Sequence, residues 1–171
     1  SGATAVVCPS TEANLGDGFF SLEAFLRARG SLAIGSDSHV STSPVEELRW
    51  LEYGQRLRTG RRTLAASDRR PSTARARLEE VGRGGASAAG VLTGALRPGS
   101  RADWIVLDSD HPILTGRRDD GLLDAWIFSG NRPAIREVWV GGERVVVEGR
   151  HPRREEHARA FRAVMDELLE R

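Results

Sequence analysis

Residues 32–57 read LAIGSDSHVSTSPVEELRWLEYGQRL, and the order of segments within them decides the fold class. The short apolar run 32–35 predicts a buried strand, and the polar residues after it predict a loop. A helix start follows, because Ser43 suits an N-cap, Pro44 suits the first helical position and Glu46 completes a capping box. A strand that leads through a loop into a helix indicates α/β organisation with parallel strands.

The residues before this stretch repeat the same order. Residues 4–8 (TAVVC) predict a first buried strand that ends before Pro9. The Pro, Asn and Gly content of residues 9–18 predicts a loop, and residues 21–29 predict a helix. The first part of the chain therefore contains two strand–loop–helix units.

The second part of the chain changes character after a long Arg-rich connection over residues 58–72. The elements predicted beyond it are a helix over 72–81, a short helix within 82–94, a strand over 103–107, a short helix or strand over 121–128, and strands over 135–140 and 143–148. Gly141 and Gly142 predict a hairpin between the last two strands. Residues 152–169 predict an amphipathic helix, with Ala158, Phe161, Val164, Met165 and Leu168 on one face.

Composition excludes several classes of protein. The 171 residues are 39% hydrophobic and 29% charged, which is typical of a folded domain. No apolar run approaches the roughly 18 residues needed to cross a membrane, and no segment reads as a secretory leader. Cys8 is the only cysteine, so an internal disulfide and a cysteine-based metal cluster are excluded. We therefore expect a cytoplasmic protein.

The number of strands is small for a stable parallel sheet. Two strands do not make an independent parallel sheet, and one hairpin with one strand does not make a sandwich. The chain also opens on Ser1, and its only methionine is Met165. We therefore expect these residues to be part of a longer protein.

Charge is nearly balanced overall, with a formal net charge of +1. Residues 49–83 are the exception, with ten Arg and four acidic residues. Such a segment either contacts phosphate groups or forms a solvated surface. No aromatic residue lies between Arg56 and Arg83 to stack on bases, so a nucleic-acid partner is not expected.

Asp37 is the sharpest candidate for chemistry because it follows a predicted strand directly. Reacting residues of β/α folds lie where strands end and loops begin, and a carboxylate there can bind a divalent metal and accept a proton from metal-bound water. An Asp between two serines can equally cap a turn. His39 can bind substrate or orient Asp37, or be an ordinary surface histidine. No His pair has the spacing of a metal-binding motif.

The residues after the first strand offer further candidates. Thr11, Glu12, Asn14 and Asp17 are polar and follow a strand end, so they can line the mouth of a site and bind substrate. The same side chains can instead satisfy backbone groups of the loop.

Several strings together resemble a known family. Residues 8–18 (CPSTEANLGDG), 35–40 (GSDSHV) and 46–57 (EELRWLEYGQRL) resemble the formimidoylglutamate deiminases of the amidohydrolase superfamily. Residues 97–108 (RPGSRADWIVLD) and 138–146 (VWVGGERVV) are similar to the small β domain that closes superfamily members in general. The resemblance covers nearly the whole chain.

The resemblance implies an α/β fold that is the C-terminal part of a metal-dependent (β/α)8 barrel. Residues 1–95 would hold the last two barrel strands and helices, 96–150 part of a composite β-sandwich domain, and 151–171 a C-terminal helix. The complete enzyme would bind one Zn²⁺, with Asp37 as a ligand and as the general base. The family's other metal ligands are absent from these residues.

The activity implied by the resemblance is hydrolysis of a small molecule, N-formimidoyl-L-glutamate, to N-formyl-L-glutamate and ammonia in histidine degradation. Zinc held by one carboxylate would be bound very weakly, so we expect this chain alone to be inactive. Dimers are common in the superfamily, and a homodimer of the complete enzyme is an expectation. The alternatives are a related deaminase of a nucleobase-like or guanidino substrate and a non-catalytic Arg-rich binding module.

Overall fold

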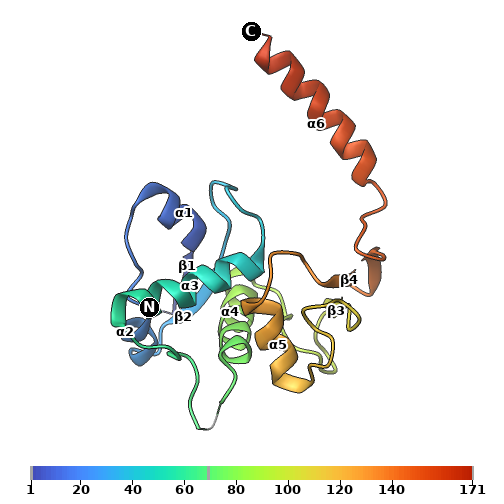
Figure 1. The fold of residues 1–171 in the computed structure, drawn as a ribbon. Helices are drawn as coiled ribbons and strands as arrows, with labels where there is room; N and C mark the ends of the chain where they lie inside the picture. Colours follow the sequence, from blue (N-terminus) through green and yellow to red (C-terminus); the bar gives the residue numbers. More distant parts are fainter. Residues whose placement is uncertain (1, 69, 171) are drawn as a thin grey trace.

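Two short parallel strands, β1 (Thr4–Val7) and β2 (Ser31–Ile34), form the sheet of the first part of the chain. They pair in register, from Thr4 opposite Ser31 to Val7 opposite Ile34, in the computed structural model (Figure 1). The structure describes residues 2–68 and 70–170. Ser1 and Arg171, at the ends of the predicted domains, and Arg69 of the Arg-rich segment therefore lie outside the described residues. The predicted parallel arrangement of the two strands is confirmed.

The prediction of a loop after the first strand is wrong, because residues Pro9–Leu15 form a helix, α1. Pro9 lies in the first turn, where its missing N–H has no helical partner to lose. The Glu12 carboxylate accepts a hydrogen bond from the backbone N–H of Cys8 (2.9 Å), and Gly16 ends the helix with a φ of 76°. The Pro and Gly residues that indicated a loop mark the two ends of a short helix.

Two further helices flank β2. The predicted helix before it is confirmed as α2 (Leu22–Arg27), and α3 (Pro44–Thr59) begins where the sequence places it. The Ser43 hydroxyl accepts a hydrogen bond from the backbone N–H of Glu46 (3.3 Å). The capping box is only half formed, because the Glu46 carboxylate binds the Ser41 hydroxyl (2.6 Å).

One long helix, α4 (Thr73–Ala89), replaces the two helices predicted over residues 72–94. Its small residues allow it to lie directly on β2. A Cβ atom added at Gly84 would lie 1.8 Å from the carbonyl oxygen of Leu32, so only glycine permits this approach.

The second part of the chain forms an antiparallel sheet with the strand order β3-β4-β5. Its strands are β3 (Trp104–Leu107), β4 (Ile135–Val140) and β5 (Glu143–Val146), and α5 (Asp119–Phe128) precedes β4 as a helix. The predicted hairpin is confirmed, and both Gly141 (φ 61°) and Gly142 (φ 86°) adopt the positive φ that a tight hairpin turn requires.

A shared hydrophobic core joins the two parts. It brings α3, α4 and α5 together with the segments on either side of α5, and its buried members are Leu48, Ala74, Leu114, Ala125, Trp126, Ile127 and Ala134. A second cluster joins β1 and β2 to α2 and α3. Its buried members are Val7, Leu22, Leu32 and Leu51. The domain boundaries at residues 95 and 150 stay predictions.

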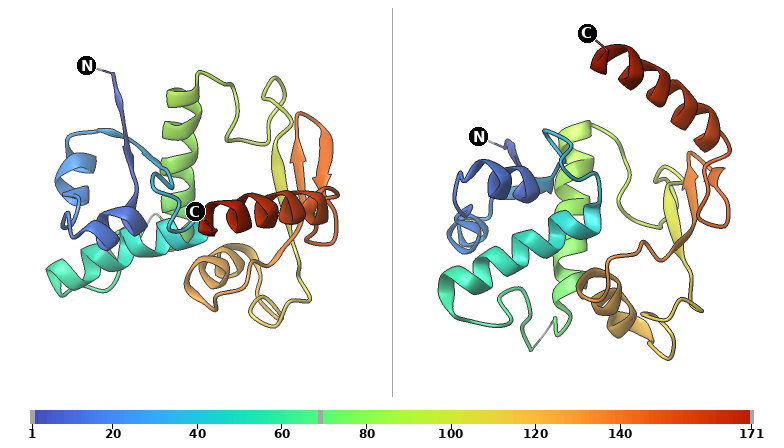
Figure 2. Two further views of the ribbon diagram at one scale, coloured as in Figure 1. Left: turned by 90° about the horizontal axis from the view of Figure 1, so that it is seen from above. Right: turned by 45° about the horizontal axis from the view of Figure 1, so that its top comes forward.

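The last helix, α6 (Arg154–Leu169), projects away from the rest of the chain (Figures 1 and 2). Its existence and extent agree with the prediction. None of its residues is buried, and the side chains of Phe161 and Leu168 are 66% and 58% exposed. Its apolar face has no covering partner within the described residues.

Candidate functional site

The carboxyl ends of β1 and β2 lie at the same edge of the sheet because the strands are parallel. Cys8 follows β1 directly, and a turn that contains Asp37 follows β2. The start of α1 and the loop between β2 and α3 therefore lie at the same end of the strands (Figure 1). This edge is the candidate site.

Asp37 occupies a strained turn at this edge. Its φ is 43°, a left-handed conformation that is uncommon for residues other than glycine. His39 has a φ of 58°, and its backbone N–H donates to the Ser36 carbonyl (3.0 Å). Both side chains are exposed. Among the described residues the Asp37 carboxylate accepts no hydrogen bond and forms no ion pair, so it is available to a ligand.

Thr11 is the other predicted site residue that the structure brings to this turn. Its side chain is buried, and its Oγ1 lies 3.2 Å from the Ser36 carbonyl oxygen and 3.0 Å from the Ser38 hydroxyl. Thr11 thus contacts the residues on both sides of Asp37.

Within the described residues, the remaining three candidates form no hydrogen bond with the turn. Glu12 is half-buried and its carboxylate caps the backbone N–H of Cys8. Asn14 lies in the last turn of α1 and Asp17 follows its end, and both side chains are exposed. Their proposed role in binding substrate stays a prediction.

A buried carboxylate that the sequence analysis missed holds α1 in place. The backbone N–H and the hydroxyl of Ser10 both donate to the Glu47 carboxylate, at 2.9 and 2.5 Å. Glu47 is only 2% exposed and lies on α3. The one sequence signal is that Glu47 lies beside Leu48 and four residues before Leu51, two apolar residues on the buried face of α3. No local pattern pairs it with Ser10.

Cys8 is half-buried beside this group. Burial, followed by the negative charges of Asp37, Glu12 and Glu47, raises the pKa of the Cys8 thiol above its ordinary value. The thiol is therefore kept protonated, so Cys8 is a poor nucleophile.

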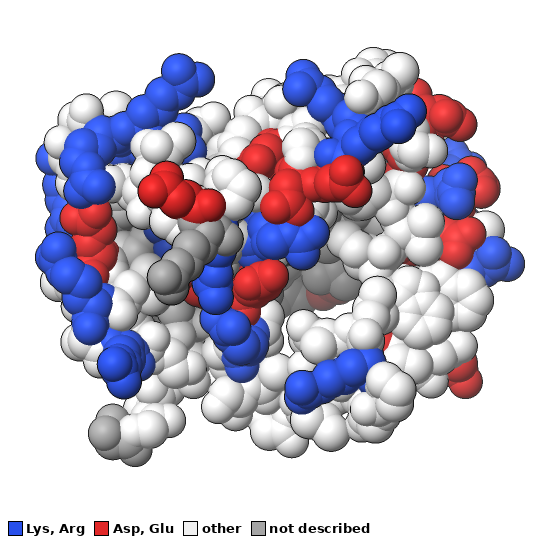
Figure 3. Space-filling model, turned by 90° about the horizontal axis from the view of Figure 1, so that it is seen from below, with Lys and Arg blue, Asp and Glu red and all other residues white. Residues whose placement is uncertain are grey.

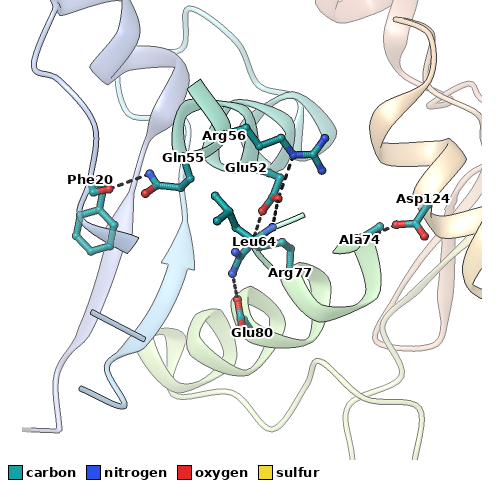
Figure 4. A network of polar contacts seen from close by, with 9 residues as sticks. All are labelled: Phe20, Glu52, Gln55, Arg56, Leu64, Ala74, Arg77, Glu80 and Asp124. Atoms are coloured by element: carbon teal, nitrogen blue, oxygen red, sulfur yellow. Dashed lines mark hydrogen bonds and ion pairs between the residues drawn. The ribbon is translucent and has the colours of Figure 1, made fainter. Parts of the chain in front are cut away.

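A second buried polar network links α3 to α4 (Figure 4). Glu52 is fully buried and receives hydrogen bonds from Arg56 (3.1 Å) and Arg77 (3.1 Å). Arg77 also binds Glu80 (2.6 Å), and Gln55 donates to the Phe20 carbonyl (2.9 Å). Every group in this network has a partner on the chain, so the network stabilises the fold rather than forming a site.

Within residues 2–68 and 70–170, no group of three or more His, Cys, Asp or Glu side chains is placed to hold a metal ion. A catalytic zinc site uses about three protein ligands. The described residues therefore do not form a three-ligand zinc site by themselves.

One hollow of the surface is lined by residues from the start of α3 and from the chain after α5, and Asp37 is not among them. A cavity of about 630 Å³ opens between residues 41–49 and 130–135. Arg49, which borders it, donates to the carbonyls of Ile127 (2.7 Å) and Gly130 (2.8 Å). These bonds tie α3 to the chain that follows α5.

The Arg-rich segment is mostly engaged within the chain. Arg side chains from residues 49–83 that hydrogen-bond or pair with other residues are Arg49, Arg56, Arg58, Arg61, Arg75 and Arg77. On the face in Figure 3, Arg side chains are interspersed with Asp and Glu side chains. This pattern weakens the hypothesis of a non-catalytic binding module.

Comparison with known sequences identifies the family. The profile of the amidohydrolase family matches residues 2–145. The chain belongs to the amidohydrolase family. It is 51% identical over 170 residues to the formimidoylglutamate deiminase of Pseudomonas aeruginosa, a match that covers 99% of this chain and 38% of that protein. It is also 35% identical over 122 residues to a 5-methylthioadenosine/S-adenosylhomocysteine deaminase of Halobacterium salinarum, covering 70% of this chain and 27% of that protein.

Solved amidohydrolase structures have the same fold. An amidohydrolase from Brucella melitensis superposes with a TM-score of 0.88 at 42% identity, over 98% of this chain and 36% of that chain. A zinc-bound adenosine deaminase from Xanthomonas campestris superposes with a TM-score of 0.77 at 23% identity, over 95% of this chain and 36% of that chain. The α/β fold is therefore confirmed as part of an amidohydrolase, and the chain spans under two fifths of the length of these relatives.

Membrane-spanning helices require a long apolar stretch. Among the described residues, no helix combines the length and the apolar character that crossing a membrane requires.

Proposed function

We propose that this chain is the C-terminal part of a formimidoylglutamate deiminase. The enzyme would hydrolyse N-formimidoyl-L-glutamate to N-formyl-L-glutamate and ammonia. The observation that carries the proposal is the 51% identity to the Pseudomonas enzyme over 99% of the chain. Asp37 lies at the strand end where a barrel enzyme of this family places reacting groups.

Asp37 has two roles in this proposal. Its exposed carboxylate is one ligand of a Zn²⁺ ion, and it is the general base that accepts a proton from the attacking water and passes it to the leaving ammonia. Bound zinc lowers the pKa of water toward neutrality and so supplies the nucleophile. The turn around Asp37 keeps the carboxylate at the strand edge, and Thr11 supports that turn.

The chain alone would be inactive, because Asp37 is a single ligand. The other ligands would come from polypeptide that corresponds to the earlier part of the longer relatives. We further propose a cytoplasmic location, as expected for an enzyme of amino-acid breakdown. A homodimer of the complete enzyme stays a prediction that light scattering can check.

A related deaminase is the second candidate function. The 35% identity to the Halobacterium deaminase favours it, although over a smaller part of the chain. A substrate with a purine-like ring would then replace formimidoylglutamate.

A chimeric enzyme tests the proposal. The 38% of the Pseudomonas deiminase that this chain matches is exchanged for residues 1–171. Ammonia release from N-formimidoyl-L-glutamate and from 5-methylthioadenosine is then measured. We expect turnover of the first substrate only, and a loss of at least about 100-fold in kcat for Asp37→Asn. The isolated chain with added zinc should release no ammonia.

Two results would contradict the proposal. A folded chimera that hydrolyses 5-methylthioadenosine and not formimidoylglutamate would favour the second candidate. Unchanged kcat in the Asp37→Asn chimera would remove Asp37 from the chemistry.

A further inference from the structure

The Thr11 hydroxyl joins two groups that flank Asp37. The Ser36 carbonyl can only accept a hydrogen bond, so the single proton of the Thr11 hydroxyl is donated there (3.2 Å). The hydroxyl of Ser38, 3.0 Å away, must then donate to Thr11. One buried hydroxyl therefore holds the residue before Asp37 and the residue after it.

The turn needs such support because its backbone is strained. Asp37 and His39 both have a positive φ, which persists in residues other than glycine only where the surroundings hold it. The Ser36 carbonyl accepts two hydrogen bonds, one from the His39 backbone N–H (3.0 Å) and one from Thr11. The bond that closes the turn and the bond from α1 thus share one acceptor.

Thr11 itself belongs to a fixed part of the chain. Its neighbour Ser10 donates two hydrogen bonds to Glu47, and all three side chains are at most 6% exposed. Glu47 lies on α3, the helix that follows the Asp37 turn. The start of α1 is therefore anchored to the same helix that ends the loop, and Thr11 connects this anchor to the turn.

We propose that Thr11 is a positioning residue, whose hydroxyl fixes the turn at Asp37 and thereby the direction of the Asp37 carboxylate. The positioning is a property of this chain by itself. Its consequence for catalysis rests on the proposed deiminase function. Two substitutions separate the hydroxyl from the packing: Thr11→Val keeps the side-chain shape, and Thr11→Ser keeps the hydroxyl.

Amide hydrogen exchange in the 171-residue chain tests the positioning directly. We expect exchange of the His39 amide to accelerate on the order of tenfold in Thr11→Val, with the amides of β1 and β2 unchanged. Thr11→Ser should restore most of the protection. Unchanged exchange at His39 in Thr11→Val overturns the proposal, and so does equal acceleration in Thr11→Ser.

A third variant keeps the test decisive if Thr11→Val does not fold. Ser38 is exposed, and Ser38→Ala removes one of the two hydrogen bonds without altering the core. We expect acceleration at His39 of about threefold in this variant. The absence of any acceleration there overturns the proposal.

The chimeric deiminase tests the catalytic consequence. Thr11→Val should lower kcat about tenfold with KM changed less than about twofold, because the reacting group is displaced while substrate contacts remain. Thr11→Ser should recover most of kcat. Equal losses in both variants would mean that the side chain acts through packing, which overturns the positioning role. If the chimera with Thr11 intact is inactive, the proposed function fails while the exchange result still decides the positioning.

Discussion

Helices α3 and α6 have the same length of 16 residues and opposite surroundings. The sequence of α6 has the clearer apolar face, yet none of its residues is buried. The residues that α3 buries include two carboxylates and an amide, and they are Glu47, Leu48, Leu51, Glu52, Gly54 and Gln55. An apolar stripe therefore shows that a helix can be covered, whereas burial depends on whether another element reaches it.

The buried charges of α3 are the most sensitive point of this comparison. Arg77→Ala would leave Glu52 buried with less positive charge beside it, and we expect a loss of about 3–5 kcal/mol in the free energy of unfolding. Urea denaturation monitored by circular dichroism measures this loss. Arg83→Ala is the control, because Arg83 is exposed and lies on α4, the helix that also contains Arg77. It should change the free energy of unfolding by less than about 0.5 kcal/mol. Equal effects at both positions would show that the network does not stabilise α3.

The apolar contacts of α3 should have the next largest effect. Leu48 is 1% exposed and lies in the shared core, so Leu48→Ala should cost about 2–4 kcal/mol by leaving a cavity. The same denaturation measurement checks it. A cost under about 1 kcal/mol would mean that the core around α5 collapses to fill the space.

The matched substitution on α6 should have the smallest effect. Leu168 is 58% exposed, so Leu168→Ala in the isolated chain should change stability by less than about 0.5 kcal/mol. The comparison with Leu48→Ala holds residue type and helix length constant. A loss above about 1 kcal/mol that grows with protein concentration would show that the face is covered by association of chains.

Most elements could be predicted because their signals are local. The start of α3 at Ser43, the hairpin at Gly141 and Gly142, and the short apolar strands each depend on residues within a few positions of one another. The errors arose where a local signal has two meanings. Pro9 and Gly16 can bound a loop or begin and end a helix, and the backbone bond from Cys8 to the Glu12 side chain decides for the helix.

Only part of the candidate site could be predicted from the sequence. Asp37 was found because it follows a strand, and Thr11 because it follows the neighbouring strand. Their connection through Ser36 and Ser38 spans more than 20 residues, and no sequence period carries such a contact.

By itself, the amino-acid sequence determined the order of the elements, the parallel and antiparallel parts, and the family strings around Asp37, since these depend on neighbouring residues. Only the tertiary structure decided which polar groups are buried together, as with Ser10 and Glu47 or Glu52 and Arg77. It also decided that α6 is left uncovered. The physical reason is that burial and hydrogen-bond partners are set by elements far apart in the chain, which meet only when the chain folds.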